Sequence, residues 1–511
     1  MKWVLSFPRT LRLDVSLAAM MVLFLLQLLT GTDLEFAELT FLAFFFSVLG
    51  VNFAGGLRTL AGWCVAVIAL KMFLIPQIAK VCYREPCQSN LELPLVTMGV
   101  IAVSMVFICL AALVTMPFRL PRVILSPVPD VNRLQKMAII SLCVGTGGFL
   151  AAQFMGVTEE GAVQLGGLPG LLRRISSCAP LAIVAGTAYT IRVSKGRRLL
   201  SLYNGIPFAA EFGIGVLFSS KQALFEPFLF TALTGIAFGF CWRRFHLLAG
   251  IGSILIAFFV LFPFGQVTRN YTRGANIRET YKKTVDYLDQ NLRNPSFLAD
   301  QYAEYRDRVE DEKGNTSYFT NPNGLLERLT LIKAADLLIS STYKQGTGGW
   351  ETINPAFADM LPRLILPRRY VDVPNILGVR AGMIEEDNTG TDIAFGFAAH
   401  AFYAFGWTGV VVSSFLLGVM LIVVTRLITR ELPGNVWAVV LLGVYQHSVA
   451  EGNIGSLLGL FTYGGAWTVA SLCCVRVLAE IWCLADKLLS SLKPTAMKDV
   501  ARPSDLELSA R

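Results

Sequence analysis

The sequence has little charge for its length. Only 16% of its 511 residues are Asp, Glu, Lys or Arg, and 54% are apolar, whereas a soluble globular protein carries about 25% charged residues. The mean hydropathy of +0.56 points the same way. These values exclude a disordered chain, a nucleic-acid-binding domain and a small disulfide scaffold. They leave a polytopic membrane protein.

The sequence also lacks the motifs of nucleotide and metal chemistry. It has no Walker loop and no G-x-G-x-x-G motif that opens a helix after a strand, so it offers no ATP-driven chemistry. Its three histidines lie far apart, and neither CxxC nor HExxH occurs, so no metal site and no cofactor is expected. Cys82 and Cys87 share one short connection, where a disulfide and two free thiols both remain open.

Twelve stretches are apolar enough to cross a membrane, which takes about 20 helical residues. The sequence therefore predicts an all-α polytopic membrane protein. The predicted spans lie near residues 13–30, 35–53, 60–79, 95–117, 137–157, 177–191, 201–218, 223–241, 245–265, 403–424, 436–449 and 456–484, of which the sixth and the eleventh are short.

One polar segment interrupts the apolar sequence. Residues 266–394 hold 16 of the 44 basic and 18 of the 36 acidic residues, a net charge of −2, so the remainder carries +10. An insert of this length can hold its own small core and is too long for a simple loop. Within it, the patterns predict helices over 276–312, broken near Asn294-Pro295, and over 324–341, the latter amphipathic. The chain thus divides into helices one to nine (1–265), the insert (266–394), helices ten to twelve (395–485) and a basic tail (486–511).

Lys and Arg in the connections predict the orientation, because cytoplasmic connections of membrane proteins are rich in these residues. With the N-terminus inside, 21 Lys and Arg residues fall in the inner segments and five in the short outer connections. We therefore expect both termini to be cytoplasmic and the insert 266–394 to lie outside.

Three arginines of the insert are candidates for binding an anion. Arg363, Arg368 and Arg369 lie in a proline-containing, largely apolar segment. Solvated charge or headgroup contact at the membrane surface is one interpretation. A phosphate site is the other, because the planar guanidinium group grips phosphate through two parallel hydrogen bonds.

Charged side chains within the spans are further candidates, because a charge in hydrocarbon is costly and is a functional candidate by default. Glu211, Glu226 and Lys71 lie within predicted spans. Arg476 and Glu480 are four residues apart, and we expect them to pair on one helix face.

Two histidines, a glutamate and a lysine lie at the outer ends of the spans. His447 and Glu451 are four residues apart, so they share one face of the eleventh span, and His400 lies at the outer start of the tenth. Structural and catalytic roles both remain open for the histidines, while a carboxylate base at the membrane edge suits Glu451. Lys221 is an isolated cation in a short outer turn, where snorkelling is the alternative to a functional role.

The layout and several short strings resemble the Wzy-type polymerases of O-antigen and exopolysaccharide, relatives of the O-antigen ligases. The shared layout is about twelve spans, inside termini and one large periplasmic loop late in the chain. LPRLILPRR (361–369) looks like the proline–arginine segment of that loop, and AFYAFGWTGVVVSSFLLG (401–418) looks like the helix that follows it. VLFSSKQALFEPFLF (216–230) is similar to a turn with a cation that is commonly Arg and here is Lys221, and GLPGLLRRISS is similar to a short outer loop that bears Arg173.

The resemblance implies a membrane glycosyltransferase of GT-C-like architecture at the periplasmic face of the bacterial inner membrane. Its donor would be a glycan on undecaprenyl diphosphate and its acceptor another lipid-linked repeat unit. The other implied partners are membrane lipids and a chain-length regulator protein, with no nucleic acid. Cations must stabilise the departing diphosphate, and a base must take the proton of the acceptor hydroxyl. We assign Glu451 or His400 to the second role, and the first to Arg363 with Arg368, Lys221 and Arg173 as weaker partners.

Two other functions remain open. An O-antigen ligase would use the same donor with a lipid A–core acceptor. A twelve-helix transporter or flippase would match the span count and the termini. However, major-facilitator proteins usually have a long connection between helices six and seven, and here that connection covers only residues 192–200.

Overall fold

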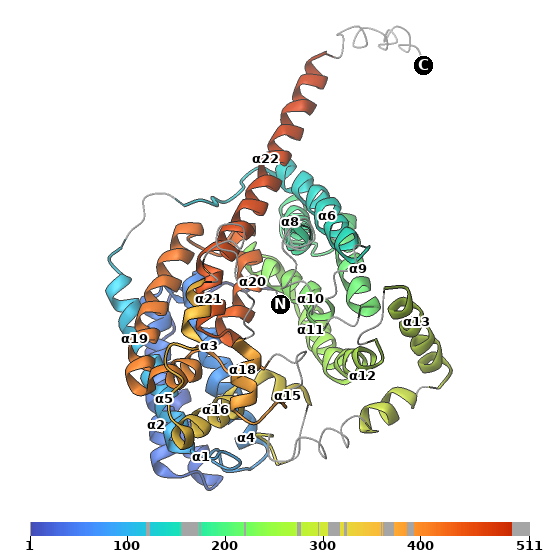
Figure 1. Cartoon of the computed structure of the whole chain (residues 1–511). Helices are drawn as coiled ribbons and strands as arrows, with labels where there is room; N and C mark the ends of the chain where they lie inside the picture. Colours follow the sequence, from blue (N-terminus) through green and yellow to red (C-terminus); the bar gives the residue numbers. More distant parts are fainter. Residues whose placement is uncertain are drawn as a thin grey trace, which may run out of the picture.

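The computed structural model describes residues 2–492 except 119–122, 155–171, 173–174, 219–220, 273–276, 295, 305–316, 321–323, 359, 361–372 and 386–392. The fold is that of an all-α membrane protein (Figure 1). Seven helices of the described part are long and apolar enough to cross a membrane: Leu34–Phe53, Leu60–Cys82, Pro94–Thr115, Val131–Ala152, Arg244–Gly265, Phe397–Ile428 and Ile454–Ser490. Three shorter apolar helices cover Leu13–Leu29, Ala179–Val193 and Ala223–Ala237.

Each of the twelve predicted stretches coincides with a helix or a run of helices. Before the insert these are α1 (Leu13–Leu29), α2 (Leu34–Phe53), α3 (Leu60–Ala69) with η2 (Leu70–Leu74) and α4 (Ile75–Cys82), α5 (Pro94–Thr115), α6 (Val131–Phe154), α8 (Ala179–Val193), α9 (Leu202–Leu217), α10 (Lys221–Ala237), and α11 (Arg244–Ile256) with η3 (Ala257–Leu261) and α12 (Phe262–Thr272). After the insert they are α19 (Phe397–Ile428), α20 (Val436–Glu451), and α21 (Ile454–Phe461) with α22 (Tyr463–Leu492).

The connections that the sequence predicts to be cytoplasmic, which are rich in Lys and Arg, lie at one end of the helix bundle. This end is called the basic end here. Arg58 pairs with Glu431 at 2.9 Å, and Arg192 donates to the backbone oxygens of Val128 and Pro129 at 2.8 Å. The N-terminal strand β1 (Lys2–Val4) pairs there with β2 (Cys241–Arg243), antiparallel. These contacts place the predicted inner connections together at one end of the molecule.

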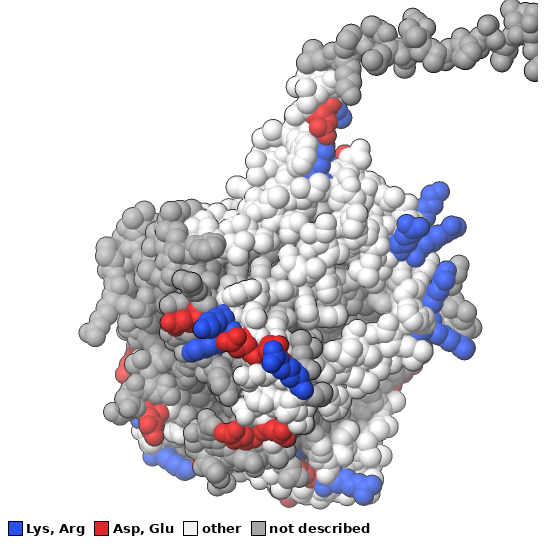
Figure 2. Space-filling model, turned by 90° about the vertical axis from the view of Figure 1, so that its right-hand side faces the viewer, with Lys and Arg blue, Asp and Glu red and all other residues white. Residues whose placement is uncertain are grey.

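Helix α22 extends beyond the other helices (Figure 1). Figure 2 shows the face turned toward the viewer after the rotation: Lys and Arg gather along one edge, acidic and basic side chains mix in a row farther down, and the surface between them carries little charge. This distribution agrees with a basic scaffold and an insert of mixed charge.

The insert begins within α12, and its other helices lie at the opposite end of the bundle, called the insert end here. Its helices are α13 (Ile277–Arg293), α15 (Gly324–Leu329), α16 (Ile332–Gln345), α17 (Ile353–Ala358) and α18 (Val373–Arg380). The predicted break near Asn294-Pro295 is confirmed, since α13 ends at Arg293. The predicted helix over 324–341 is instead two helices, because the backbone N–H of Leu331 donates to the carbonyl oxygen of Lys71 at 3.2 Å and not within its own helix.

The buried carboxylate of Asp336 holds α16 on the membrane helices. Asp336 is fully buried and accepts hydrogen bonds from the backbone N–H groups of Glu92 (2.6 Å) and Leu93 (3.0 Å) and from the hydroxyl of Thr97 (2.8 Å). Leu93 is the N-cap of α5, so the carboxylate lies at a helix N-terminus, where a negative charge is favoured.

Other polar residues on the same face of α16 bind the connection before α5. Lys333 donates to the backbone oxygen of Asn90 at 2.6 Å, and Ser340 and Lys344 donate to the carboxylate of Glu92 at 2.5 and 2.7 Å. The bonds from Lys344 and Ser340 lower the pKa of the Glu92 carboxyl below its ordinary value. The polar face of this amphipathic helix therefore binds protein along Lys333, Asp336 and Ser340 and reaches solvent at Lys344.

A second contact between insert and scaffold surrounds Lys80. This fully buried side chain donates to Glu85 and Ser89 at 2.6 and 2.7 Å, and its ammonium lies 4.8 Å from the centre of the Tyr318 ring. The Tyr318 hydroxyl donates to the backbone oxygen of Cys87 at 2.6 Å. Of the two outcomes open for Cys82 and Cys87, the structure has two free thiols, the first exposed and the second buried.

The insert and the membrane helices share one apolar core in the described residues. Ile332, Leu338 and Leu377 of the insert belong to the same buried cluster as the side chains of α3, α5 and α20. Tyr287 of α13 instead packs in a small separate cluster with Phe264 and Val267 of α12. The C-terminal half of the insert thus depends on the scaffold for its burial.

We predict that Asp336→Ala lowers the free energy of unfolding by about 1–3 kcal/mol, because three buried donors lose their acceptor. Asp336→Asn, which keeps one acceptor oxygen, should lose less. Thermal unfolding of the purified protein in detergent measures this. The control is Lys344→Ala, which breaks an exposed ion pair worth about 0–1 kcal/mol, and equal losses in Asp336→Ala and the control would contradict the assignment.

Candidate functional site

Several elements meet at the insert end around the π-helical turn η2. A π-helical turn inside an α-helix is rare and is frequent at functional sites. Gly396, with φ +75°, starts α19 beside this turn: a Cβ there would lie 2.9 Å from the sulfur of Met72 and 3.5 Å from the backbone oxygen of Ala450. The chain therefore passes between η2 and the end of α20 at a glycine, because a φ of +75° is strained for any residue with a Cβ. The bond from Leu331 to the Lys71 carbonyl adds the start of α16 to this junction.

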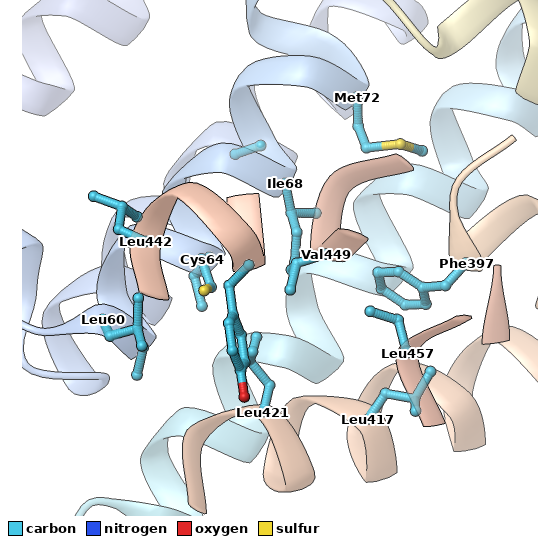
Figure 3. Close-up of a cluster of buried hydrophobic side chains, with 14 of the residues drawn as sticks. Leu60, Cys64, Ile68, Met72, Phe397, Leu417, Leu421, Leu442, Val449 and Leu457 are labelled. Carbon is cyan, nitrogen blue, oxygen red and sulfur yellow. The ribbon is translucent and has the colours of Figure 1, made fainter. Parts of the chain in front are cut away.

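The floor of the junction is apolar and closely packed (Figure 3). Leu60, Cys64, Ile68 and Met72 follow one another at four-residue spacing and face one way along α3 and η2. They meet buried side chains of α19, α20 and α21, among them Leu417, Leu421, Phe397, Leu442, Val449 and Leu457. The charged side chains of the junction, described next, are attached to helices that pack through this apolar cluster.

Three polar side chains form a cluster above the floor. Lys71 donates a hydrogen bond to Oε1 of Glu451, and Nδ1 of His447 lies 3.2 Å from Oε2 of the same carboxylate. The exposed fractions of the side chains are 19% for Lys71, 21% for Glu451 and 60% for His447. A mostly enclosed carboxylate with one oxygen beside the exposed His447 side chain is a geometry that suits a general base.

The sequence predicted part of this cluster. The shared face of His447 and Glu451 is confirmed by their contact. Lys71 was recognised as a charge within a span, but its partner lies 380 residues away, and no local pattern joins them. The expected pairing of Arg476 with Glu480 is also confirmed, at 3.3 Å.

His400 lies below the cluster and is fully buried. The backbone N–H of Ile454 donates to its Nδ1 at 3.2 Å, so Nε2 carries the proton and donates to the hydroxyl of Thr352 at 2.8 Å. Both ring nitrogens are thereby occupied. This geometry favours the structural role for His400, in which it ties the start of α19 to the insert and to the first turn of α21.

The predicted anion-binding residues lie mostly outside the described residues. This holds for Arg363, Arg368, Arg369 and Arg173, while Lys221 is the first residue of α10 and its side chain is not described. The described flank of the proline–arginine segment is α17, which packs on α21. A Cβ added at Gly455 of α21 would lie 3.0 Å from the Cβ of Ala356 of α17. Gly455 follows Glu451 by four residues.

Helix α19 is broken near its start, within the string AFYAFGWTG. Phe405 and Gly406 have non-helical backbone angles, so the helix consists of 397–404 and 407–428. The backbone oxygens of Tyr403 and Ala404 at the break accept hydrogen bonds from Gly348 and Gly349 of the insert, both at 2.9 Å. The insert thus satisfies carbonyl groups that the break leaves without helical partners.

No group of three or more His, Cys, Asp or Glu side chains that could hold a metal occurs in the described part of the chain. No protein-family model, no curated protein and no solved structure matches the sequence.

We predict that His400→Ala lowers the free energy of unfolding by about 1–3 kcal/mol, because Ile454 and Thr352 lose their buried partner. His400→Asn should retain part of this stability, since its side-chain oxygen can accept from Ile454. Thermal unfolding in detergent provides the measurement, with His447→Ala as the exposed control. Retention of full stability in His400→Ala would exclude the structural role.

Proposed function

We propose that the chain is a polymerase of undecaprenyl-diphosphate-linked oligosaccharide repeat units at the periplasmic face of the bacterial inner membrane, which builds O-antigen or exopolysaccharide. In this proposal it has twelve spans in a GT-C-like arrangement, cytoplasmic termini and a periplasmic insert. The observation that carries the proposal is the partly exposed cluster of Lys71, Glu451 and His447 at the insert end.

The position of the cluster supports an activity at the membrane edge. It lies where α20 ends at Glu451 and where η2 interrupts a span, directly beside the start of α16. Both a lipid-linked donor held in the bilayer and a glycan outside it can reach such a place. Lys71 of η2 lies 380 residues before Glu451, while His447 and Glu451 share α20, so the fold brings two segments that are far apart in the sequence together there.

The reaction needs one base and several cations. The acceptor hydroxyl oxygen attacks the anomeric carbon of the donor sugar, the bond from that carbon to the diphosphate oxygen breaks, and the diphosphate leaves with the electron pair. Glu451 takes the hydroxyl proton. Lys71 and His447 orient its carboxylate through their contacts, and His400 positions the surrounding helices.

The developing charge on the diphosphate requires cations that are already in place. We assign Arg363 this role, with Arg368, Lys221 and Arg173 as weaker partners. The packing of α17 on α21 supports the assignment for the proline–arginine segment, because it anchors the described flank of that segment near Glu451. The donor bond is already activated, so the reaction needs neither ATP nor a nucleotide sugar.

We predict that Glu451→Gln lowers polymerisation by about 10²–10⁴-fold, the usual contribution of a general base. Cells should then accumulate single repeat units, as read from the glycan ladder on a gel. The control is Glu92→Gln, which removes a carboxylate that is also paired at the insert end but lies outside the cluster of Lys71, Glu451 and His447. If the Glu451→Gln variant makes polymer of wild-type length at an equal protein level, Glu451 is not the general base.

Arg363→Ala and Lys221→Ala test the cations. Each is expected to shorten the polymer, and unchanged length and yield in both would end the diphosphate assignment. Purified protein in liposomes separates the alternatives: lengthening of a lipid-linked glycan without an ion gradient supports a polymerase, transfer to a lipid A–core acceptor indicates a ligase, and movement of the glycan without lengthening indicates a flippase.

A further inference from the structure

A group of large aromatic side chains is exposed where α19 breaks. Trp350, Phe405 and Trp407 are 57%, 37% and 45% exposed. The Trp350 and Phe405 rings meet edge to face with centroids 4.9 Å apart, and Trp407 meets Phe402 in the same way at 5.5 Å. Trp350 belongs to the insert, and Phe405 and Trp407 belong to α19, so two separate segments contribute exposed aromatic side chains at the break.

This surface continues the apolar side of α19. Val412, Leu416 and Leu427 are 48%, 55% and 42% exposed along the same helix. The part of α19 from Trp407 to Ile428 is about 33 Å long at 1.5 Å per residue, close to the hydrocarbon thickness of about 30 Å. Trp407 therefore lies at one boundary of the hydrocarbon, where tryptophan is enriched in membrane proteins.

Arg380 lies in the same place with unused hydrogen-bonding capacity. Its Nη2 donates to the backbone oxygen of Gly346 at 3.1 Å, and its buried Nε has no hydrogen-bond partner. Its guanidinium carbon lies 5.9 Å from the centre of the Tyr403 ring. No acidic side chain pairs with Arg380 among the described residues.

The scaffold fixes these groups relative to one another. Gly348 and Gly349 are bonded to the backbone of α19 at the break, and a Cβ at Gly348 would lie 2.3 Å from the Tyr403 ring, so only glycine fits there. Ser341 donates to the backbone oxygen of Arg380 at 2.6 Å. Arg380, Trp350, Phe405 and Trp407, called the boundary cluster below, are thus held in one arrangement.

We propose that the boundary cluster binds the phosphate headgroup of a bilayer phospholipid: Arg380 contacts the phosphate, while Trp350, Phe405 and Trp407 lie among the headgroups and the first acyl carbons. The planar fork of a guanidinium group complements a phosphate, and tryptophan has an apolar body with a polar edge that suits this layer. The proposal does not depend on the polymerase activity. It fixes the depth at which the insert end meets the membrane.

The test measures lipid retention by the full-length protein in native mass spectrometry. The probes are phosphatidylglycerol and diacylglycerol with the same acyl chains, which differ in the phosphate headgroup. We expect the protein to retain phosphatidylglycerol preferentially, and Arg380→Gln to lower this retention about tenfold, the loss of one charged hydrogen-bonding contact. Arg380→Lys, which keeps the charge without the planar fork, should lie between. Equal retention of the two lipids would overturn the proposal.

Two further arms identify the occupant. The control Arg293→Gln removes an exposed arginine of α13 that is paired with Asp289, and it should leave retention unchanged; an equal loss there would show a general charge effect and overturn the site. Quenching of tryptophan fluorescence by phosphatidylglycerol brominated near the headgroup should fall in Trp350→Phe. If Arg380→Gln weakens retention of a polyprenyl diphosphate but not of phosphatidylglycerol, the occupant is not a bilayer phospholipid and the proposal fails. The proposal also fails if a soluble oligosaccharide quenches the tryptophan fluorescence and the brominated lipid does not.

Discussion

The arrangement of the insert end depends on one buried carboxylate at the start of a membrane helix. Asp336 occupies the N-terminus of α5 and satisfies three donors there. Buried charge is tolerated only where several hydrogen bonds replace water, so α16 has one position in which its polar face is stable. That position brings Leu331 against the Lys71 carbonyl and sets the entrance to the charged cluster. A side chain of the insert thereby determines the geometry of groups on the membrane helices.

The ion pair of Lys71 and Glu451 is expected to add little to the free energy of unfolding. Partly burying two charges costs desolvation that their attraction only roughly offsets, and apolar replacements of similar volume are often as stable. The floor beneath the pair is fully apolar, so an apolar pair would pack well there. The retention of two charges and an interrupted helix at one place therefore calls for a functional explanation, which is the physical reason that the base is assigned to Glu451 and not to the fully satisfied His400.

The sequence determines the elements more clearly than their contacts. Apolar length predicted the seven described helices that are long enough to cross a membrane, and the turn residues Asn294-Pro295 predicted where α13 ends, because such residues act locally. The interruption between α15 and α16 was missed, since its cause is a hydrogen bond to a carbonyl about 260 residues earlier. Lys71 and Glu451 were each recognised as unusual and were not paired for the same reason: periodicity reports faces of one helix and carries no information about which helices meet.

The broken helix α19 shows why the insert and the membrane helices cannot be understood separately. A break within a membrane helix frees carbonyl groups, and a free carbonyl in hydrocarbon costs several kcal/mol, so the break can persist only where protein supplies donors. Gly348 and Gly349 of the insert supply them. The same loop presents Trp350 against Phe405 at the break. An insert that folded independently would leave these carbonyls unsatisfied, and α19 would then be driven to close its break. The shape of α19 at its break therefore depends on the polar insert.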